Sequence, residues 1–299
     1  MKKLHLLILF SLFTVIVSAQ NNYMLYSFKG NVSVVENKVE TKAKVGKTVS
    51  ANAVVKVPSG AAVTIICNEA AMFTFSKAGS YTLNKFGDSC TVGNNSVSAN
   101  YVKYVWAQMT KSSGSPGSNR KAYMNTVGAV SRGLPNVWVD ARLDTINYSD
   151  GAFPISWKSY EEAKEFDFKL YNYDNVSTPI YSTVIKDKKK IDINSFTDKM
   201  KPGNSYFWTA SIKGEDSEEY KTLHYVTKED FKIIENKLKS QGAAFEAKAE
   251  QAYRMGFMLE DAHFLSEAFQ YYNKAATLDS TNALYRSTLM SFRKDYEMK

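Results

Sequence analysis

The hydrophobic pattern of this chain changes its period near Lys228, after which it remains helical. Before that point, short segments such as residues 166–171 alternate apolar and polar side chains, which is typical of strands with one buried face. Beyond it, Phe231, Ile234 and Leu238 recur at intervals of three and four residues, as on one face of a helix. We therefore predict a mainly β chain with a C-terminal α-helical segment.

The first 20 residues predict export. Two lysines precede an apolar run from Leu6 to Val17, and small residues then occupy the positions that a signal peptidase requires. The run of about 12 residues is too short to cross a hydrocarbon core about 30 Å thick. We expect residues 1–19 to be removed and the mature chain to begin at Gln20.

The mature chain is expected to carry no membrane anchor. Gln20 is not the cysteine that lipidation would need, and no later run approaches the ~18 apolar residues of a membrane helix. We predict a soluble protein that is periplasmic, secreted or otherwise associated with the envelope, with no transmembrane segment.

The sequence contains two cysteines, Cys67 and Cys90. In an oxidising compartment such a pair is expected to form a disulfide, and the alternative is two buried free thiols. A bridge would close a loop of about 24 residues, which stabilises a fold by about 3 kcal/mol on the chain-entropy estimate. The separation does not match the C-x-x-C spacing of a redox catalyst.

The formal net charge is +8, but the lysines alternate with acidic residues along the chain. Nucleic-acid binding requires clustered cations, so this distribution argues against a nucleic-acid partner. The densest basic run, residues 186–190, is predicted to form the solvated tip of a hairpin between two strands.

No recognisable catalytic pattern occurs. The mature chain retains only His224 and His263, about 40 residues apart and without zinc-ligand spacing. Glycine-rich phosphate loops and the G-x-S-x-G nucleophile pattern are absent from the sequence. We predict no catalytic residue, no cofactor site and no metal site, and expect the protein not to be an enzyme.

The segment 20–92 contains several short strand patterns separated by turns. They lie at residues 30–34 (GNVSV), 45–47 (VGK), 54–66 around a Pro-Ser-Gly turn, and 78–83 (AGSYTL). In these motifs the segment resembles the FecR-like domain family. The resemblance implies an extracytoplasmic β-domain, of a kind that in some members takes part in envelope signalling.

Residues 93–133 are predicted to connect two folded regions. Val102, Val105, Trp106 and Met109 have helical spacing, which indicates a short amphipathic helix. The following stretch, residues 111–119, is rich in serine and glycine and is expected to be a linker or long loop.

Residues 134–227 again have strand patterns. A strand ending at Trp157 comes early, and a Pro-Gly turn later leads into Tyr206 and Trp208. This arrangement resembles a fibronectin type III or related immunoglobulin-like sandwich, in which the strand-leading tyrosine forms a corner. We expect all three aromatic residues to belong to the core.

Residues 228–299 are predicted to be helical. The spacing of Ala268, Tyr272, Ala275 and Leu278 resembles the second helix of a tetratricopeptide repeat, which would span residues 249–282. A further helix is expected from Ala283 to about Tyr296. A single repeat cannot bury its face alone, so these helices must pack against other parts of the chain or a partner.

The tetratricopeptide resemblance implies a groove along the first helix of the repeat. The positions facing it are Glu250, Tyr253, Phe257 and Glu260, which we take as the candidate partner-binding groove. The two aromatic residues would serve as interface anchors. The alternative is that they pack on the preceding helix of the same chain.

We predict a non-enzymatic, exported envelope protein of a Gram-negative bacterium that acts as a protein-protein interaction scaffold or adaptor for other envelope proteins. One alternative, from the FecR-like resemblance, is a sensory or regulatory ligand-binding protein. Another is a glycan or peptidoglycan binder, because some of the 19 tyrosines could form exposed stacking surfaces.

Overall fold

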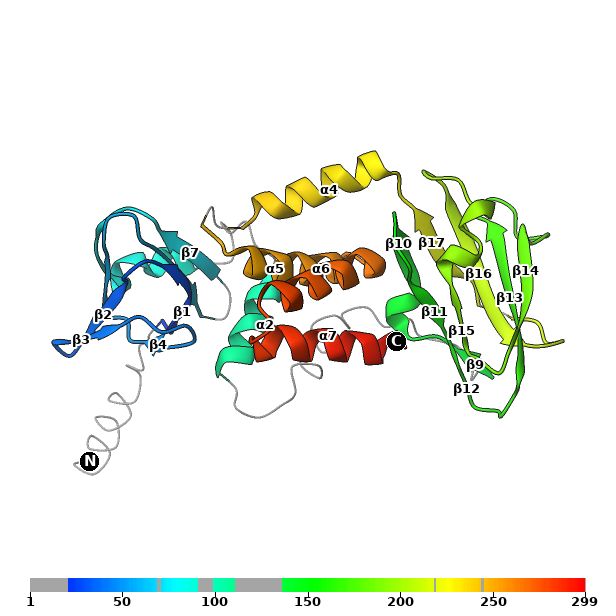
Figure 1. Ribbon diagram of the computed structural model, residues 1–299, viewed down its shortest axis with the longest axis horizontal. Coiled ribbons are helices and arrows are strands. Elements are labelled where there is room, and N and C mark those ends of the chain that lie inside the picture. Colours follow the sequence, from blue (N-terminus) through cyan, green and yellow to red (C-terminus); the bar gives the residue numbers. More distant parts are fainter. Residues whose placement is uncertain are drawn as a thin grey trace, which may run out of the picture. The chain divides into compact units, whose positions relative to one another are not determined.

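The computed structural model describes most of the chain from Asn21 onward: residues 21–68, 71–90, 99–110, 136–217, 219–242 and 245–298. The predicted signal peptide, residues 1–19, and the predicted serine-glycine linker, residues 111–119, lie outside the described residues. The contacts divide the chain into two compact units, residues 1–95 and 96–299, which are described separately. The predicted fold class is confirmed, with antiparallel sheets followed by C-terminal helices (Figure 1).

Unit 1 consists of two four-stranded antiparallel sheets. The first has the order β4 (Thr48–Val49), β1 (Tyr23–Lys29), β6 (Ala62–Cys67) and β7 (Ala71–Phe75). The second has the order β3 (Val39–Lys42), β2 (Ser33–Glu36), β5 (Val54–Val57) and β8 (Gly79–Thr82), and a 3-10 segment, η1 (Leu83–Cys90), follows.

The two sheets of unit 1 share one apolar core. Val34 and Val55 from one sheet and Ile65 from the other are fully buried in the same cluster. Alternation along β5 buries every second residue, as a strand with one covered face requires. The turn before β2 needs a glycine, because Gly30 has φ +80° and a Cβ there would lie 2.9 Å from Cβ of Ala61.

A disulfide joins the end of β6 to the end of η1. Cys67 and Cys90, the predicted pair, lie at disulfide distance, with their Cα atoms 5.3 Å apart, and both are buried. Tyr23 reinforces the same region, because its hydroxyl donates a 3.0 Å hydrogen bond to the carbonyl of Leu83. Segment η1 is therefore held to the first sheet by one covalent and one polar link.

Unit 2 contains a β-region and five helices within the described residues. Its strands are β9 (Val137–Trp138), β10 (Thr145–Tyr148), β11 (Pro154–Ser156), β12 (Lys158–Ser159), β13 (Glu165–Asn172), β14 (Tyr181–Lys186), β15 (Lys190–Asp192), β16 (Ser205–Ile212) and β17 (Lys221–Tyr225). Its helices are α2 (Ala99–Thr110), α4 (Lys228–Ser240), α5 (Lys248–Asp261), α6 (Leu265–Leu278) and α7 (Ala283–Asp295).

The main sheet of unit 2 has the order β10-β17-β16-β13-β14. Strands β10 and β17 run parallel, whereas the other neighbours are antiparallel. Two short sheets, β11 with β15 and β9 with β12, complete the β-region. The predicted hairpin at residues 186–190 is wrong, because β14 and β15, which flank this run, pair with strands of different sheets.

Aromatic residues fill the space between the main sheet and the β11–β15 pair. The ring of Trp157 stacks 6.4 Å from Phe168, which in turn stacks 6.0 Å from Trp208. Both tryptophans and Tyr206 are buried, as expected. The hydroxyl of Tyr206 accepts a 2.7 Å hydrogen bond from the backbone N–H of Lys201 and so ties the Pro-Gly turn to its strand.

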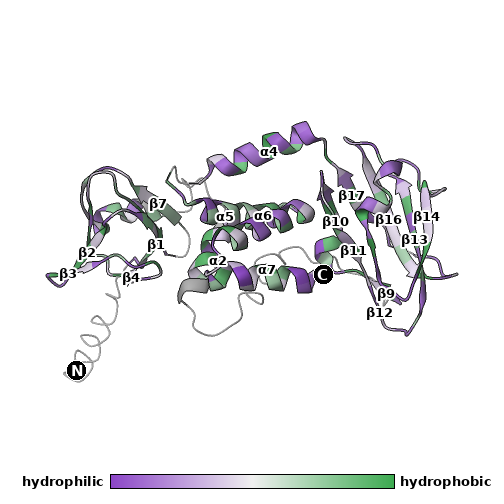
Figure 2. Ribbon diagram, viewed as in Figure 1, coloured by the Kyte–Doolittle hydropathy of each residue, from purple (hydrophilic) through white to green (hydrophobic). Residues whose placement is uncertain are grey.

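The helices follow the predicted boundaries closely. Helix α4 begins after Thr227, whose hydroxyl accepts a hydrogen bond from the N–H of Asp230. Most of its residues are hydrophilic (Figure 2), and none of them is buried. Helices α5 and α6 pack tightly because Gly256 has no side chain: a Cβ there would lie 2.7 Å from the ring of Tyr272. No helix among the described residues is long and apolar enough to cross a membrane.

We expect the Cys67–Cys90 bridge to stabilise unit 1 without affecting unit 2. Replacing both cysteines with alanine should lower the free energy of unfolding of unit 1 by about 3 kcal/mol, because the unfolded chain regains loop entropy. All 4 tryptophans of the sequence lie in unit 2. Far-UV circular dichroism should therefore show an earlier urea transition, while the transition seen by tryptophan fluorescence stays in place. A fluorescence transition that moves with it would contradict this prediction.

Candidate functional site

The predicted partner groove on α5 is filled by the chain itself. Tyr253, Phe257 and Glu260 are only 2%, 0% and 3% exposed, and Glu250 is half-buried. Helix α2 covers this face: the ring of Tyr104 stacks 4.8 Å from Phe257. The groove residues are therefore core contacts of unit 2 and not an open surface, which corrects the expectation.

Polar groups specify how α2 fits onto α5. The hydroxyls of Tyr104 and Tyr253 are 2.7 Å apart, and Thr288 of α7 lies 3.1 Å from the Tyr253 hydroxyl. Burial raises the pKa of Tyr253 well above its usual value of 10, so the phenol remains protonated and able to donate. This network joins α2, α5 and α7 at one point. Its directional hydrogen bonds define the position of α2 on α5 more specifically than an apolar contact alone would.

Glu260 has a similar internal role. Its carboxylate accepts hydrogen bonds from the hydroxyls of Tyr272, at 3.0 Å, and Tyr296, at 3.1 Å. The guanidinium of Arg254, also buried, forms a bidentate pair with Glu246 at 2.8 and 2.9 Å. Glu260 thus connects α5 with α6 and with Tyr296, which follows α7. Arg254 connects α5 with Glu246 in the segment that precedes α5.

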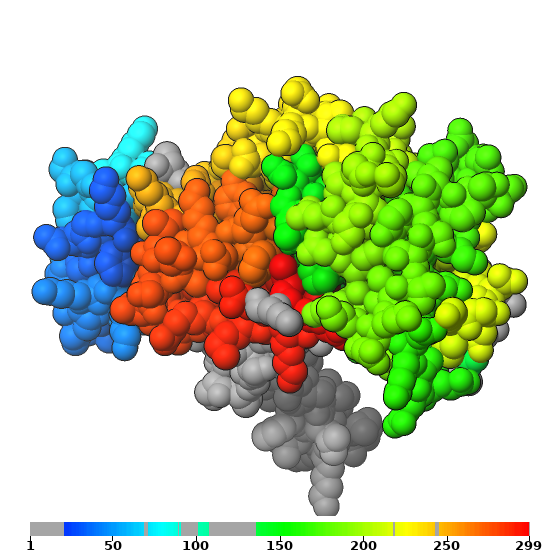
Figure 3. Space-filling view, turned by 45° about the vertical axis from the view of Figure 1, so that its right-hand side comes forward, coloured from blue at the N-terminus to red at the C-terminus, as the bar shows by residue number. Residues whose placement is uncertain are grey.

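The helices and the β-region of unit 2 are joined at the open edge of β10. The backbone N–H groups of Ser149 and Asp150, just beyond this strand, donate 2.7 and 3.0 Å hydrogen bonds to Oε1 of Glu267 in α6. The N–H of Asn147 donates to the carbonyl of His263 in the turn before α6. A strand edge that would otherwise expose unpaired donors is thereby capped by helix residues. In Figure 3 the orange surface of the helices directly adjoins the green surface of the β-region.

Glu267 is itself almost completely buried. Burial raises the pKa of its carboxyl to about 7, and the backbone hydrogen bonds oppose this only in part. Its second oxygen, Oε2, has no hydrogen-bond partner in the described part of the chain. The carboxyl of the folded protein is therefore mainly protonated only below about pH 7.

The face of the main sheet that points away from the core carries an aromatic patch. We use this term for Tyr171, Tyr173, Phe207 and Tyr220. Tyr173 stacks 4.6 Å from Phe207, which lies 5.8 Å from Tyr220. Tyr173 and Tyr220 are 55% and 43% exposed, so aromatic surface faces solvent where polar side chains are usual.

A hollow of about 650 Å³ adjoins the aromatic patch. Tyr173 lines it together with Lys199, Lys201 and the Pro-Gly turn before β16. The sequence analysis did not identify this surface, because it considered only Trp157, Tyr206 and Trp208 among the aromatic residues of this region. The signal was present, since Tyr171 and Phe207 occupy the polar positions of alternating strands, next to the buried Leu170 and Trp208.

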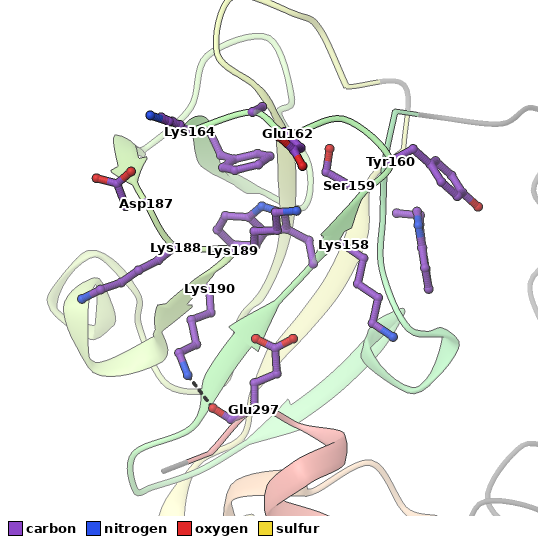
Figure 4. A pocket seen from close by; sticks show the side chains of 14 residues that line it. Lys158, Ser159, Tyr160, Glu162, Lys164, Asp187, Lys188, Lys189, Lys190 and Glu297 are labelled. Atoms are coloured by element: carbon purple, nitrogen blue, oxygen red, sulfur yellow. Dashed lines mark hydrogen bonds between the residues drawn. The ribbon is translucent and has the colours of Figure 1, made fainter.

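A second surface of unit 2 is a basic pocket of about 860 Å³ (Figure 4). Its lining includes five lysines, Lys158, Lys164, Lys188, Lys189 and Lys190, and two exposed or half-buried aromatic residues, Trp138 and Tyr160. These residues come from β9, β12, the segment before β13 and the β14–β15 connection. The sequence analysis identified the basic run at residues 186–190, but it did not predict that Lys158 and Lys164 join this run, because they are distant along the chain and meet it only in the fold.

A serine and a histidine also lie side by side on the main sheet. Oγ of Ser205 and Nδ1 of His224 are 2.6 Å apart, on directly opposed positions of β16 and β17. Among the described residues, no hydrogen bond joins this imidazole to a carboxylate, and no three metal-ligating side chains cluster. The contact has the geometry of an ordinary cross-strand pair.

Neither the known protein-family models nor the curated proteins include a match for this chain. The function is therefore inferred from the chain's own surfaces and their chemistry.

We expect Glu267 to make unit 2 less stable as the pH rises. Between its ordinary pKa of 4.5 and its folded pKa of about 7, the folded state binds more protons than the unfolded state. The free energy of unfolding should therefore fall across this window, by about 3 kcal/mol in total. Urea titrations followed by tryptophan fluorescence at several pH values would measure it.

Glu267→Gln provides the matched control for this pH effect. The amide oxygen can still accept the two backbone hydrogen bonds, but the side chain no longer titrates. The variant should lose the pH dependence between about 4.5 and 7 and be more stable than the wild type at pH 8. An unchanged pH profile in the variant would show that another group causes the effect.

Proposed function

We propose that this protein is a non-enzymatic, exported protein of the bacterial envelope that acts as an interaction scaffold for other envelope proteins. The aromatic patch carries the proposal. Tyrosine is enriched among the residues that dominate protein-protein binding energy, and exposed aromatic clusters on a rigid sheet provide large contact areas at low entropic cost.

The remaining features support export and a modular construction. The signal-like N-terminus and the Cys67–Cys90 pair agree with an oxidising compartment, either the periplasm or the exterior. The motifs of unit 1 resemble FecR-like domains. The hydrogen bond from Lys201 to the Tyr206 hydroxyl resembles the tyrosine corner of immunoglobulin-like sandwiches, and α5 with α6 resembles a tetratricopeptide pair.

The binding mode that we propose uses the sheet and not the helical groove. Helix α2 occupies the face of α5 on which a peptide would lie, so a partner would have to displace it. The aromatic patch needs no such displacement, because Tyr173 and Tyr220 are already exposed. The adjoining hollow beside Lys201 offers a recess into which a partner side chain can insert.

Tyr173→Ala combined with Tyr220→Ala should abolish partner capture. We would crosslink wild-type and variant protein in envelope extract, identify the recovered protein by mass spectrometry, and measure binding with the purified pair. Loss of two aromatic anchors should weaken binding by at least about tenfold. The matched control is Ile233→Ala with Met290→Ala, two comparably exposed apolar residues on α4 and α7, which should leave capture unchanged.

Two outcomes would contradict this scaffold proposal. Undiminished capture by the tyrosine variant would show that the aromatic patch is not the interface. Recovery of the protein on insoluble glycan, with no stoichiometric protein partner, would exclude a scaffold role.

A further inference from the structure

We propose that the basic pocket of unit 2 is a binding site for an acidic oligosaccharide, that is, a chain of sugar rings bearing carboxylate or phosphate groups. The site is separate from the aromatic patch and depends on none of its residues. The proposal follows from the charge, the aromatic lining and the size of the pocket.

The charge of the pocket is unbalanced. Five lysines face three acidic residues, Glu162, Asp187 and Glu297, and none of these lysines forms an ion pair with a carboxylate in the described part of the chain. Lys190 donates to the backbone carbonyl of Glu297 at 2.5 Å, as the dashed line in Figure 4 shows. The three acidic residues offset only part of the lysine charge, so the lining has a net positive charge, which favours an anionic ligand.

The lysines are held near aromatic rings. Nζ of Lys158 lies 4.7 Å from the ring centre of Trp138, and Nζ of Lys189 lies 5.9 Å from that of Phe166. These cation-π contacts restrict the ammonium groups, so less side-chain entropy is lost when an anion binds. Lys164 and Lys188 remain exposed at the rim.

Flat apolar faces lie beside the charges. The rings of Trp138 and Tyr160 are 6.2 Å apart and inclined by 34°, and Tyr160 is 69% exposed. The C–H groups of a pyranose ring can pack on such faces while its acidic substituents reach the lysines. An acidic peptide could also pair with the lysines, but its acidic side chains would not pack on the exposed aromatic pair as a sugar ring does. For this reason we favour the glycan.

The floor and the volume of the pocket are also suitable for binding an oligosaccharide. Trp157, which is 1% exposed, lines it, and its indole N–H has no hydrogen-bond partner among the described residues. A buried donor without an acceptor is costly and uncommon in a folded protein. The pocket is open to solvent, and its volume of about 860 Å³ is within the range of ligand-binding clefts, enough for roughly two or three sugar rings.

The test uses the purified exported protein and defined probes. Trigalacturonate carries one carboxylate on each ring, maltotriose has the same number of rings without charge, and hexa-aspartate represents an acidic peptide. Trp138 and Trp157 line the pocket, so intrinsic fluorescence reports binding, and calorimetry gives the affinity. We expect saturable binding of trigalacturonate that weakens with salt, and no binding of maltotriose.

Variants locate the site. Lys164→Gln with Lys188→Gln should weaken trigalacturonate binding about tenfold, at roughly threefold for each exposed charge. Tyr160→Ala should weaken it about fivefold through the lost stacking face. The matched control, Lys232→Gln with Lys237→Gln, removes two exposed charges from α4 and should leave the affinity unchanged.

Each other outcome overturns the proposal. Equal or tighter binding of hexa-aspartate would assign the pocket to acidic peptides, and equal weakening by the α4 control would mean diffuse charge attraction only. Absence of saturable binding at millimolar trigalacturonate would show that the pocket binds no acidic glycan of this kind. The Tyr173→Ala and Tyr220→Ala protein should bind the probe normally, so failure of the scaffold proposal leaves this test intact.

Discussion

The capping of β10 by Glu267 is the contact on which the architecture of unit 2 depends. One carboxyl oxygen accepts hydrogen bonds from two backbone N–H groups at the end of an edge strand, and the turn before α6 receives a third from Asn147. Without these acceptors, the strand edge would leave buried donors unpaired. The β-region and the helices are therefore not independent modules, because the helices complete the sheet.

Much of the fold follows from local pattern. Alternation in β13 and the three-and-four spacing of α5 and α6 were sufficient to predict these elements, because burial on one face imposes those periods. The helix at α2 was also predicted, but its docking position was not. Its contacts with Tyr253 and Thr288 span 149 and 184 residues of sequence, and local periodicity carries no information about such pairs.

The candidate sites were harder to predict than the fold. The basic pocket unites Lys158, Lys164 and the run 188–190, which meet because β14 and β15 belong to different sheets. From the sequence alone, the basic run at residues 186–190 was interpreted as the solvated tip of a hairpin. The aromatic patch was missed for another reason. Phe207 lies between two buried aromatic residues, so its outward position has to be inferred from the alternation along the strand, and the strand register agrees with that position.

The parallel pairing of β10 with β17 gives the β-region a mechanical property. These strands are the first and last of the main sheet along the chain, and four residue pairs align between them. Tension applied through the two ends of the region would pull along the strands, so that the ladder hydrogen bonds bear the load together and not one after another. A protein that connects envelope components would gain resistance to stretching from this arrangement, in addition to the stability of its core.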